Sequence, residues 1–430
     1  MRVKRFTSVI TLAALLPLTA VAQEKITLLH AGWLLVEPGT TPALEHTVVI
    51  VGDRIRDVVS GYLDASAFPQ DDVNIIDLKH AYVLPGLLDM HVHLTLAPDA
   101  LGEFARDSQA DLAMRATENA QITLMAGFTT VRDLGSASTE AILAVRDAIN
   151  RGVVPGPRII AAGQSISATG GHGDLRGLRS DIAALTLSSA VCDGADDCRR
   201  AVRDLYKLGA DTIKLNATGG GADPNGRRDS LPEMFDDELV AIVETAHALN
   251  LRVAAHAHGT AGIVAALNAK VDSIEHGSWI DPAIIAQLKM QPAWLVPTAY
   301  LQDYFLARPN IPEAAQESRR DNVALMHPML GRAMEEGVRI AMGTDAGIMP
   351  HGQNANEIIK YVELGMTPMQ AIETATTSAA EMIGWTNLVG QLGVGYFADI
   401  IAVEGNPLED ISTLQHVPFV MAGGHVAKAW

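Results

Sequence analysis

Short apolar, β-branched runs recur from residue 82 to residue 345, and each ends in a polar residue or glycine. Amphipathic segments such as Asp237–Asn250, with apolar residues at helical spacing, follow them. The runs are Tyr82–Leu94, Phe128–Leu134, Arg158–Ser165, Thr212–Thr218, Arg252–His258, Ser273–Gly277, Trp294–Thr298 and Arg339–Asp345. Alternating strands and helices favour a parallel sheet with right-handed crossovers. We therefore predict an α/β fold, with a (β/α)8 TIM barrel over residues 81–388.

A doubly wound open sheet is the alternative architecture for this pattern. It would need a glycine-rich fingerprint after its first strand, and the sequence has none there. The two ends of the chain instead contain short alternating strands separated by turn residues. We predict that residues 23–80 and 389–430 together form one small β-sandwich domain beside the barrel.

Residues 1–22 have the pattern of a signal peptide. A basic start precedes an apolar run from Phe6 to Leu18, and Ala20-Val21-Ala22 supplies the small residues of a cleavage site. The apolar run is shorter than the roughly 20 residues that span a bilayer. We therefore expect cleavage after Ala22 and export to a bacterial periplasm or to the medium, with no stable membrane anchor.

Composition narrows the classes of partner. The chain has 50 acidic and 32 basic residues, a net charge of −18, which becomes −21 without the three basic residues of the leader. Nucleic-acid-binding proteins present basic faces, so we expect no nucleic-acid partner. The hydrophobic content of 48% also excludes a disordered chain.

The two cysteines of the chain, Cys192 and Cys198, enclose a short acidic loop. In an oxidising compartment they are close enough in sequence to pair. A soft metal site is the alternative, but no histidine lies near them. We favour a disulfide with a local structural role.

Polar residues at the ends of the predicted strands suggest a metal site. Barrels of this kind carry their chemistry at the C-terminal ends of the strands. Alternate residues of a strand point the same way, so two histidines spaced by one residue can face the same centre. Imidazole nitrogen suits a borderline cation such as Zn²⁺. The residues placed at these ends are His91, His93, Lys214, His256 or His258, His276 and Asp345.

These motifs resemble those of the amidohydrolase superfamily. The similar segments are LPGLLDMHVHL, TIKLNATGG, VAAHAHG, SIEHG and MGTDAG, and the resemblance extends from about residue 25 to 430. A lysine on the fourth strand and GGHGD after the third are similar to the prolidase-like branch. That branch includes enzymes acting on Xaa-Pro or Xaa-Arg/Lys bonds and amidohydrolases that cleave ochratoxin A into phenylalanine and ochratoxin α. The sequence looks most similar to the bacterial ochratoxin-degrading enzymes, although Asn216 replaces a more apolar residue.

The resemblance implies two divalent metal ions, with Zn favoured by the nitrogen-rich ligands. His91, His93 and Asp345 match the ligands of the more buried ion. His256 and His276 match those of the second ion, and His258 then lies behind them or contacts the substrate. Lys214 matches a lysine that is carboxylated by CO2 and bridges both ions.

The activity that the resemblance implies is cleavage of the amide bond to a C-terminal amino acid by a metal-bridging hydroxide. Asp345 would take the proton of the attacking water and give it to the departing amine. His172 is placed to hydrogen-bond the developing oxyanion. The substrate would be a small amide or dipeptide with a free carboxylate, which Arg227, Arg228 and Tyr300 are candidates to bind.

Three alternatives remain at this point. The enzyme could be an Xaa-Pro or Xaa-Arg/Lys dipeptidase or carboxypeptidase, or a cyclic-amide hydrolase or deaminase on the same scaffold. A binding protein with a degenerate site is disfavoured because every expected ligand type is present. The resemblance further implies a homo-oligomer, such as an octamer. Arg132 and Asp133 are interpreted as a structural ion pair beneath the site.

Overall fold

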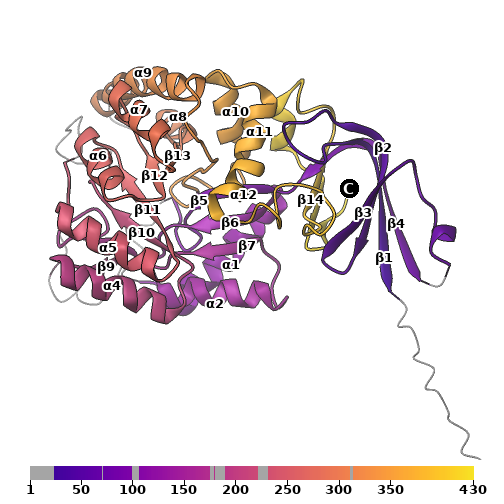
Figure 1. Ribbon diagram of the computed structural model, residues 1–430, viewed down its shortest axis with the longest axis horizontal. Helices are drawn as coiled ribbons and strands as arrows, with labels where there is room; N and C mark the ends of the chain where they lie inside the picture. Colours follow the sequence, from indigo (N-terminus) through magenta and orange to yellow (C-terminus); the bar gives the residue numbers. More distant parts are fainter. Residues whose placement is uncertain are drawn as a thin grey trace, which may run out of the picture.

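The computed structural model describes residues 24–69, 71–98, 106–174, 179, 189–220, 231–309 and 313–430. The predicted signal peptide, residues 1–22, lies outside the described residues. Figure 1 shows a body of strands surrounded by helices and, at the right of the view, a separate sheet that contains the first strands of the chain. The barrel and the second domain are therefore both present.

The barrel strands are parallel and follow the predicted order. β5, β6 and β7 form one hydrogen-bonded group, and β13, β12, β11, β10, β8 and β9 form another. Their bounds are β5 (Leu87–Val92), β6 (Phe128–Asp133), β7 (Arg158–Ala161), β8 (Ser165–Ser167), β9 (Ser189–Val191), β10 (Thr212–Asn216), β11 (Arg252–Ala257), β12 (Ser273–His276) and β13 (Trp294–Val296).

The eighth predicted run, Arg339–Asp345, lies between the last and the first strands. The Ala341 amide donates to the Leu295 carbonyl of β13 over 3.1 Å, and the Asp345 amide donates to the His91 carbonyl of β5 over 2.7 Å. Its backbone thus connects β13 to β5. This connection confirms the predicted TIM-barrel arrangement.

Helices cover the outside of the strands (Figure 1). None of the helices among the described residues is long and apolar enough to cross a membrane. The helices are α1 (Gln109–Met125), α2 (Thr139–Asn150), α4 (Ala195–Leu208), α5 (Asp236–Ala248), α6 (Thr260–Asn268), α7 (Pro282–Met290), α8 (Tyr300–Ala307), α9 (Glu313–Glu335), α10 (Ala355–Glu363), α11 (Pro368–Thr374) and α12 (Thr377–Ile383), with 3-10 turns η1 (Ala65–Ala67) and η3 (Ile411–Gln415).

Strands from both ends of the chain build the second domain. They form a seven-stranded sheet in the order β16-β15-β14-β4-β1-β2-β3. The bounds are β1 (Lys25–Leu34), β2 (Ala43–Val51), β3 (Arg54–Ser60), β4 (Asp72–Pro85), β14 (Ile400–Val403), β15 (Phe419–Ala422) and β16 (His425–Lys428). The prediction that the N- and C-terminal segments pair is confirmed.

The first predicted barrel strand, Tyr82–Leu94, is divided in the structure. Its first part, up to Pro85, belongs to β4 and pairs with β14 of the other sheet. Pro85 has no amide hydrogen with which to continue a ladder. A Cβ added at the following Gly86 would lie 2.3 Å from Thr129 Oγ1, so only glycine permits this close approach. The chain changes sheets at this dipeptide.

The predicted disulfide between Cys192 and Cys198 is confirmed. Cys192 follows β9, and Cys198 lies in the first turn of α4. Both cysteines are buried. The bond therefore anchors the start of α4 to the end of the preceding strand.

Candidate metal centre

A cavity of about 220 Å³ lies at the C-terminal ends of the barrel strands. The walls of this cavity contain most of the site residues that were predicted from the sequence. They come from five different strand ends and one loop, so only the closed barrel brings them together. The lining residues include His91, His93, His172, Lys214, His256, His276 and Asp345.

The Asp345 carboxylate, at the end of the eighth strand, lies close to both histidines at the end of the first strand. Its Oδ1 lies 3.0 Å from His93 Nε2 and 3.6 Å from His91 Nε2. The Nζ of Lys214 lies 3.4 Å from His91 Nε2. Ligand atoms of His91, His276 and Asp345 all lie within 4.8 Å of one another. One cation could contact this group.

A second group consists of His256, His258 and His276, whose ligand atoms also lie within 4.8 Å of one another. The Nε2 atom of His256 is buried and has no hydrogen-bond partner. Buried polar groups are almost always paired, so this atom fits a metal ligand. His256 lines the cavity, whereas His258 stacks on His276 at 4.6 Å and bonds to Ser278 Oγ. This arrangement favours His256 as the ligand.

Three of these histidines are oriented by hydrogen bonds at Nδ1. His91 donates to Glu275 Oε2 over 2.9 Å, and His93 donates to the Gly135 carbonyl over 2.6 Å. His276 Nδ1 pairs with Thr298 Oγ1 over 2.8 Å. Metal-binding histidines commonly use their second nitrogen in this way. Their Nε2 atoms remain available as ligands.

Burial lowers the pKa of His91, His256 and His276, which favours the neutral imidazole that binds metals. Burial opposes the charged form of His93 as well, but the Asp345 carboxylate raises the pKa of this residue. The pKa of His91 is lowered to about 4, mainly by burial and secondly by the positive charge of the nearby Lys214. Burial likewise lowers the pKa of Lys214 to about 8. Burial by itself would raise the pKa of Asp345, but His91 and His93 hold it well below its usual range. The carboxylate is therefore ionised at neutral pH.

The backbone adopts a left-handed conformation at three non-glycine residues of the site. The φ angles are 70° at His276, 49° at Thr298 and 64° at Asp345. Such φ values are uncommon in residues with a Cβ and gather at functional sites. Of these three side chains, those of His276 and Asp345 line the cavity, and that of Thr298 bonds to His276. No feature of the sequence indicated this.

His172 lies at the cavity, where its ring stacks on His256 at a centroid distance of 4.2 Å. The His172 amide donates to Glu233 Oε2 over 2.5 Å. Glu233 precedes α5 on the chain, whereas His172 follows β8. The carboxylate therefore joins the two loops that border this side of the cavity.

Among the described residues, none of the predicted substrate contacts lines the cavity. Tyr300 begins α8 and is half-buried, but it is not among the described residues that line the cavity. Arg227 and Arg228 lie outside the described residues. Ser165 and Asn216, which were given no role, line the cavity, and Asn216 Nδ2 donates to Ser165 Oγ over 3.1 Å. Asn216, whose polarity was unexpected, therefore contributes to the wall.

The interpretation of Arg132 and Asp133 as an ion pair is wrong. Adjacent residues of a strand face opposite sides, and Asp133 accepts instead from the Leu94 amide and Ser136 Oγ. Arg132 instead forms an ion pair with Glu275, a residue that had no predicted role. Burial opposes ionisation of Glu275, but Arg132 and His91 lower its pKa to about 2.

Glu275 precedes His276 directly, and a regular strand would turn the two side chains to opposite faces. The left-handed backbone at His276 ends this alternation. As a result Glu275 contacts Arg132 inside the barrel while His276 lines the cavity. The SIEHG motif contained the residue, but its contacts depend on β6.

Comparison with known proteins identifies related sequences over most of the chain. A model of the amidohydrolase family matches residues 82–427. The ochratoxinase of Aspergillus niger is 34% identical over 438 residues, which cover 94% of this chain and 87% of that protein.

Solved structures are similar over the same range. A Xaa-Pro dipeptidase with methionine bound in its active site has a TM-score of 0.83 and 35% identity, covering 93% of this chain and 99% of that one. The A. niger ochratoxinase structure has a TM-score of 0.84 at 31% identity, covering 95% and 96%. A prolidase in complex with N-methylphosphonate-L-proline has a TM-score of 0.84 at 31% identity, covering 94% and 100%.

Proposed function

This chain belongs to the amidohydrolase family and is a hydrolase, and we propose that it cleaves the amide bond to a C-terminal amino acid with the aid of two divalent metal ions. One observation carries the proposal. Four histidines, a lysine and an aspartate from five strand ends line a single cavity at the C-terminal face of the barrel. Active sites of TIM-barrel enzymes lie on this face.

The donor set fits two metal ions. His91, His93 and Asp345 would hold one, and His256 and His276 would hold the other. The unpartnered Nε2 of His256 supports this assignment, and the high share of nitrogen ligands favours Zn. Divalent ions bound there would lower the pKa of a water molecule and polarise the scissile carbonyl.

We propose that Lys214 is carboxylated by CO2. Its amine is buried and lies 3.4 Å from His91 Nε2, where an ammonium group would be repelled by two cations. The lowered pKa of Lys214, about 8, makes the neutral amine accessible. Addition of that amine to CO2 forms a carbamate and releases one proton. The carbamate supplies anionic oxygens of the kind that divalent ions attract.

Two side chains would move or bind charge during hydrolysis. Ionised Asp345 can accept the proton of the attacking water and pass it to the departing amine. His172 borders the cavity beside His256 and can donate a hydrogen bond to the developing oxyanion.

The relatives suggest the substrate class. We propose an N-acyl amino acid with a free carboxylate, and ochratoxin A, which would give phenylalanine and ochratoxin α, is the first candidate on the ochratoxinase similarity. A Xaa-Pro dipeptide is the second, because a Xaa-Pro dipeptidase is 35% identical. Arg227, Arg228, Tyr300 and His258 remain proposed substrate contacts.

We also propose that the protein is exported and forms a homo-oligomer. The disulfide between Cys192 and Cys198 supports an oxidising compartment. Export and assembly do not change the chemistry proposed for the cavity.

The first experiment measures substrate range and metal content. Metal-free protein is reconstituted with Zn, and kcat/KM is measured for ochratoxin A, N-acyl-phenylalanine, Xaa-Pro and Xaa-Arg substrates. We expect two Zn per chain and the highest kcat/KM for acylated phenylalanine. Preference for Xaa-Pro would instead support the second candidate. A protein without bound metal, or without hydrolysis of any of these amides, contradicts the proposal.

The variant Lys214→Ala tests the bridging carbamate. We expect kcat to fall at least about 100-fold, because the second metal ion loses an anionic ligand. Acetate, which supplies a carboxylate, should restore part of the activity, whereas methylamine should not. Recovery with methylamine alone would mean that Lys214 acts as a cation.

A further inference from the structure

A buried ion pair lies beneath the candidate metal centre, and the proposed hydrolysis assigns it no role. Arg132 on β6 and Glu275 on β12 are joined by a 2.8 Å contact, and their side chains are 4% and 0% exposed. Removing such charges from water is unfavourable for each ion, and their mutual attraction often fails to offset that cost. A role beyond stability would account for a pair at this position.

The second carboxylate oxygen of Glu275 points at the metal centre. Glu275 Oε2 accepts from His91 Nδ1 over 2.9 Å, while Oε1 accepts from Arg132 and Ser273. The remaining guanidinium nitrogens of Arg132 are also engaged: Nε donates to the Met90 carbonyl over 2.7 Å, and Nη1 donates to Ser273 Oγ over 3.2 Å. The carboxylate is thus held on both sides.

His91 differs from the other oriented histidines in its partner. Glu275 is a carboxylate, whereas His93 and His276 bond to a neutral carbonyl and a neutral hydroxyl. An ionised acceptor forms a stronger hydrogen bond. It also increases the basicity of the opposite ring nitrogen, and such partners strengthen metal binding.

We propose that Glu275 is a positioning residue that fixes His91 with Nδ1 protonated and Nε2 directed at the metal, and that Arg132 orients Glu275. This inference rests on the proposed metal-dependent function. Neither residue contacts the substrate. Their effect reaches the reaction through His91.

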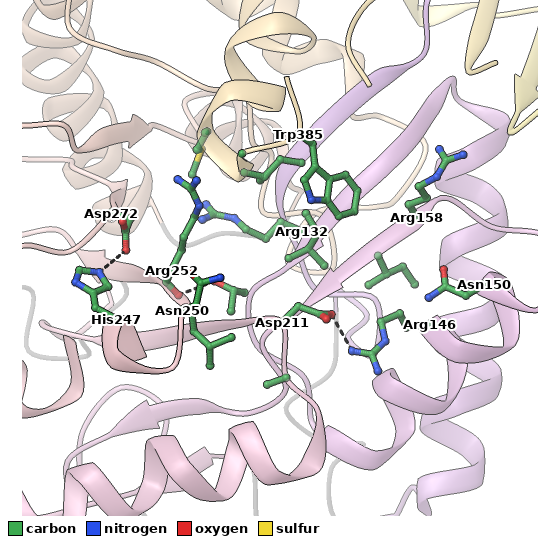
Figure 2. A pocket seen from close by; sticks show the side chains of 18 of the residues that line it. Arg132, Arg146, Asn150, Arg158, Asp211, His247, Asn250, Arg252, Asp272 and Trp385 are labelled. Carbon is green, nitrogen blue, oxygen red and sulfur yellow. Dashed lines mark hydrogen bonds and ion pairs between the residues drawn. The ribbon is translucent and has the colours of Figure 1, made fainter. Parts of the chain in front are cut away.

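Arg132 approaches Glu275 from the opposite end of the barrel. It lines a pocket of about 1050 Å³ beside the first residues of β7, β10 and β11, which is the N-terminal face. Figure 2 shows Arg132 among the side chains of this pocket, with Arg252 and Trp385. Changing Arg132 therefore alters the support of Glu275 without altering any proposed ligand.

The test compares Glu275→Gln with the double variant Arg132→Met/Glu275→Gln. Glutamine has nearly the shape of glutamate but no charge. The double variant leaves no unpaired buried charge, so it should fold even if the single variant is destabilised. Zinc affinity is measured by competition with a chelator, and kcat and KM are measured in zinc-saturated protein. We expect both variants to lose at least about 10-fold in zinc affinity and in kcat, with KM nearly unchanged.

Asp399→Asn is the matched control, because Asp399 is another buried carboxylate paired with an arginine, Arg158, away from the cavity. It should lower the Tm without changing zinc affinity. Wild-type zinc affinity in the folded double variant would overturn the positioning role. Wild-type protein that binds no zinc would instead overturn the proposed function.

Discussion

Glu357 supports the candidate site from a position that the sequence did not reveal. It is fully buried on α10 and accepts from the backbone amides of Ala299 and Tyr300 over 2.7 and 2.8 Å. These amides follow Thr298, which orients His276. Tyr300, predicted as a substrate contact, thus lies in a segment fixed from behind by Glu357.

Glu357 should also make stability depend on pH. Burial raises its pKa from 4.5 to about 8, although the two amide bonds oppose the shift. Between pH 4.5 and about 8 the folded state therefore holds a proton that the unfolded state lacks. The contribution of Glu357 to the free energy of unfolding falls as the pH rises through this range.

We expect Glu357→Gln, which is neutral at every pH, to lose that part of the pH dependence. The measurement is the Tm of both proteins from pH 5 to pH 8.5, with the exposed Glu404→Gln as control. The difference in Tm between wild type and Glu357→Gln should change across this range, while that of the control stays constant. A constant difference for Glu357→Gln would show that the carboxyl is already ionised at pH 5.

The connection between β9 and α4 depends on the disulfide. Gly194 at the N-cap of α4 provides no side-chain cap, and its amide is bound by Glu238 of α5 instead. The bond between Cys192 and Cys198 closes a short loop around this N-terminus. Local capping is weak here, so the covalent link and the neighbouring helix supply the restraint.

Replacing both cysteines by serine should lower stability by about 2 kcal/mol, the value expected for a loop of this length. Calorimetry should show a Tm that is a few degrees lower for the double variant. Reduction of the wild-type protein with dithiothreitol should give the same Tm, and the variant itself should not respond. An unchanged Tm would mean that α5 alone anchors α4.

The barrel and the terminal sheet are joined by charged and aromatic contacts. Arg158, at the start of β7, pairs with Asp399, just before β14. The Phe397 ring lies between two guanidinium groups, with centroid distances of 3.5 Å to Arg54 and 3.7 Å to Arg158. Residues from both chain ends and from the barrel therefore meet at one place.

Asp399→Asn should destabilise the protein by about 3 kcal/mol. This lies at the lower end of the range for breaking a buried pair, because the Arg158 side chain is 20% exposed. Urea unfolding would measure the loss, and kcat/KM at a temperature where the variant is folded should stay within about twofold of wild type. A large fall in kcat/KM of the folded variant would instead show that this interface influences the cavity.

The sequence by itself determined the order of strands and helices, the pairing of the chain ends and the set of candidate ligands. Periodicity is a local property, and residues at the ends of parallel strands must meet at one face of a barrel. His91 and His93, two positions apart, could therefore be placed at the same face as Asp345, and the family resemblance implied that the three bind one ion. The pairing of Cys192 with Cys198 was likewise accessible from their short separation.

Only the tertiary structure decided which side chains support that site. Glu275 lies 143 positions from Arg132 and 184 from His91, and no local pattern relates such residues. The hydrogen bond of His258 to Ser278, the support of Tyr300 by Glu357 and the division of the first strand at Pro85 likewise depend on neighbouring elements. Strand alternation indicates which side of its own strand a residue faces, whereas the packing of distant strands and the left-handed turns at their ends determine what it meets there.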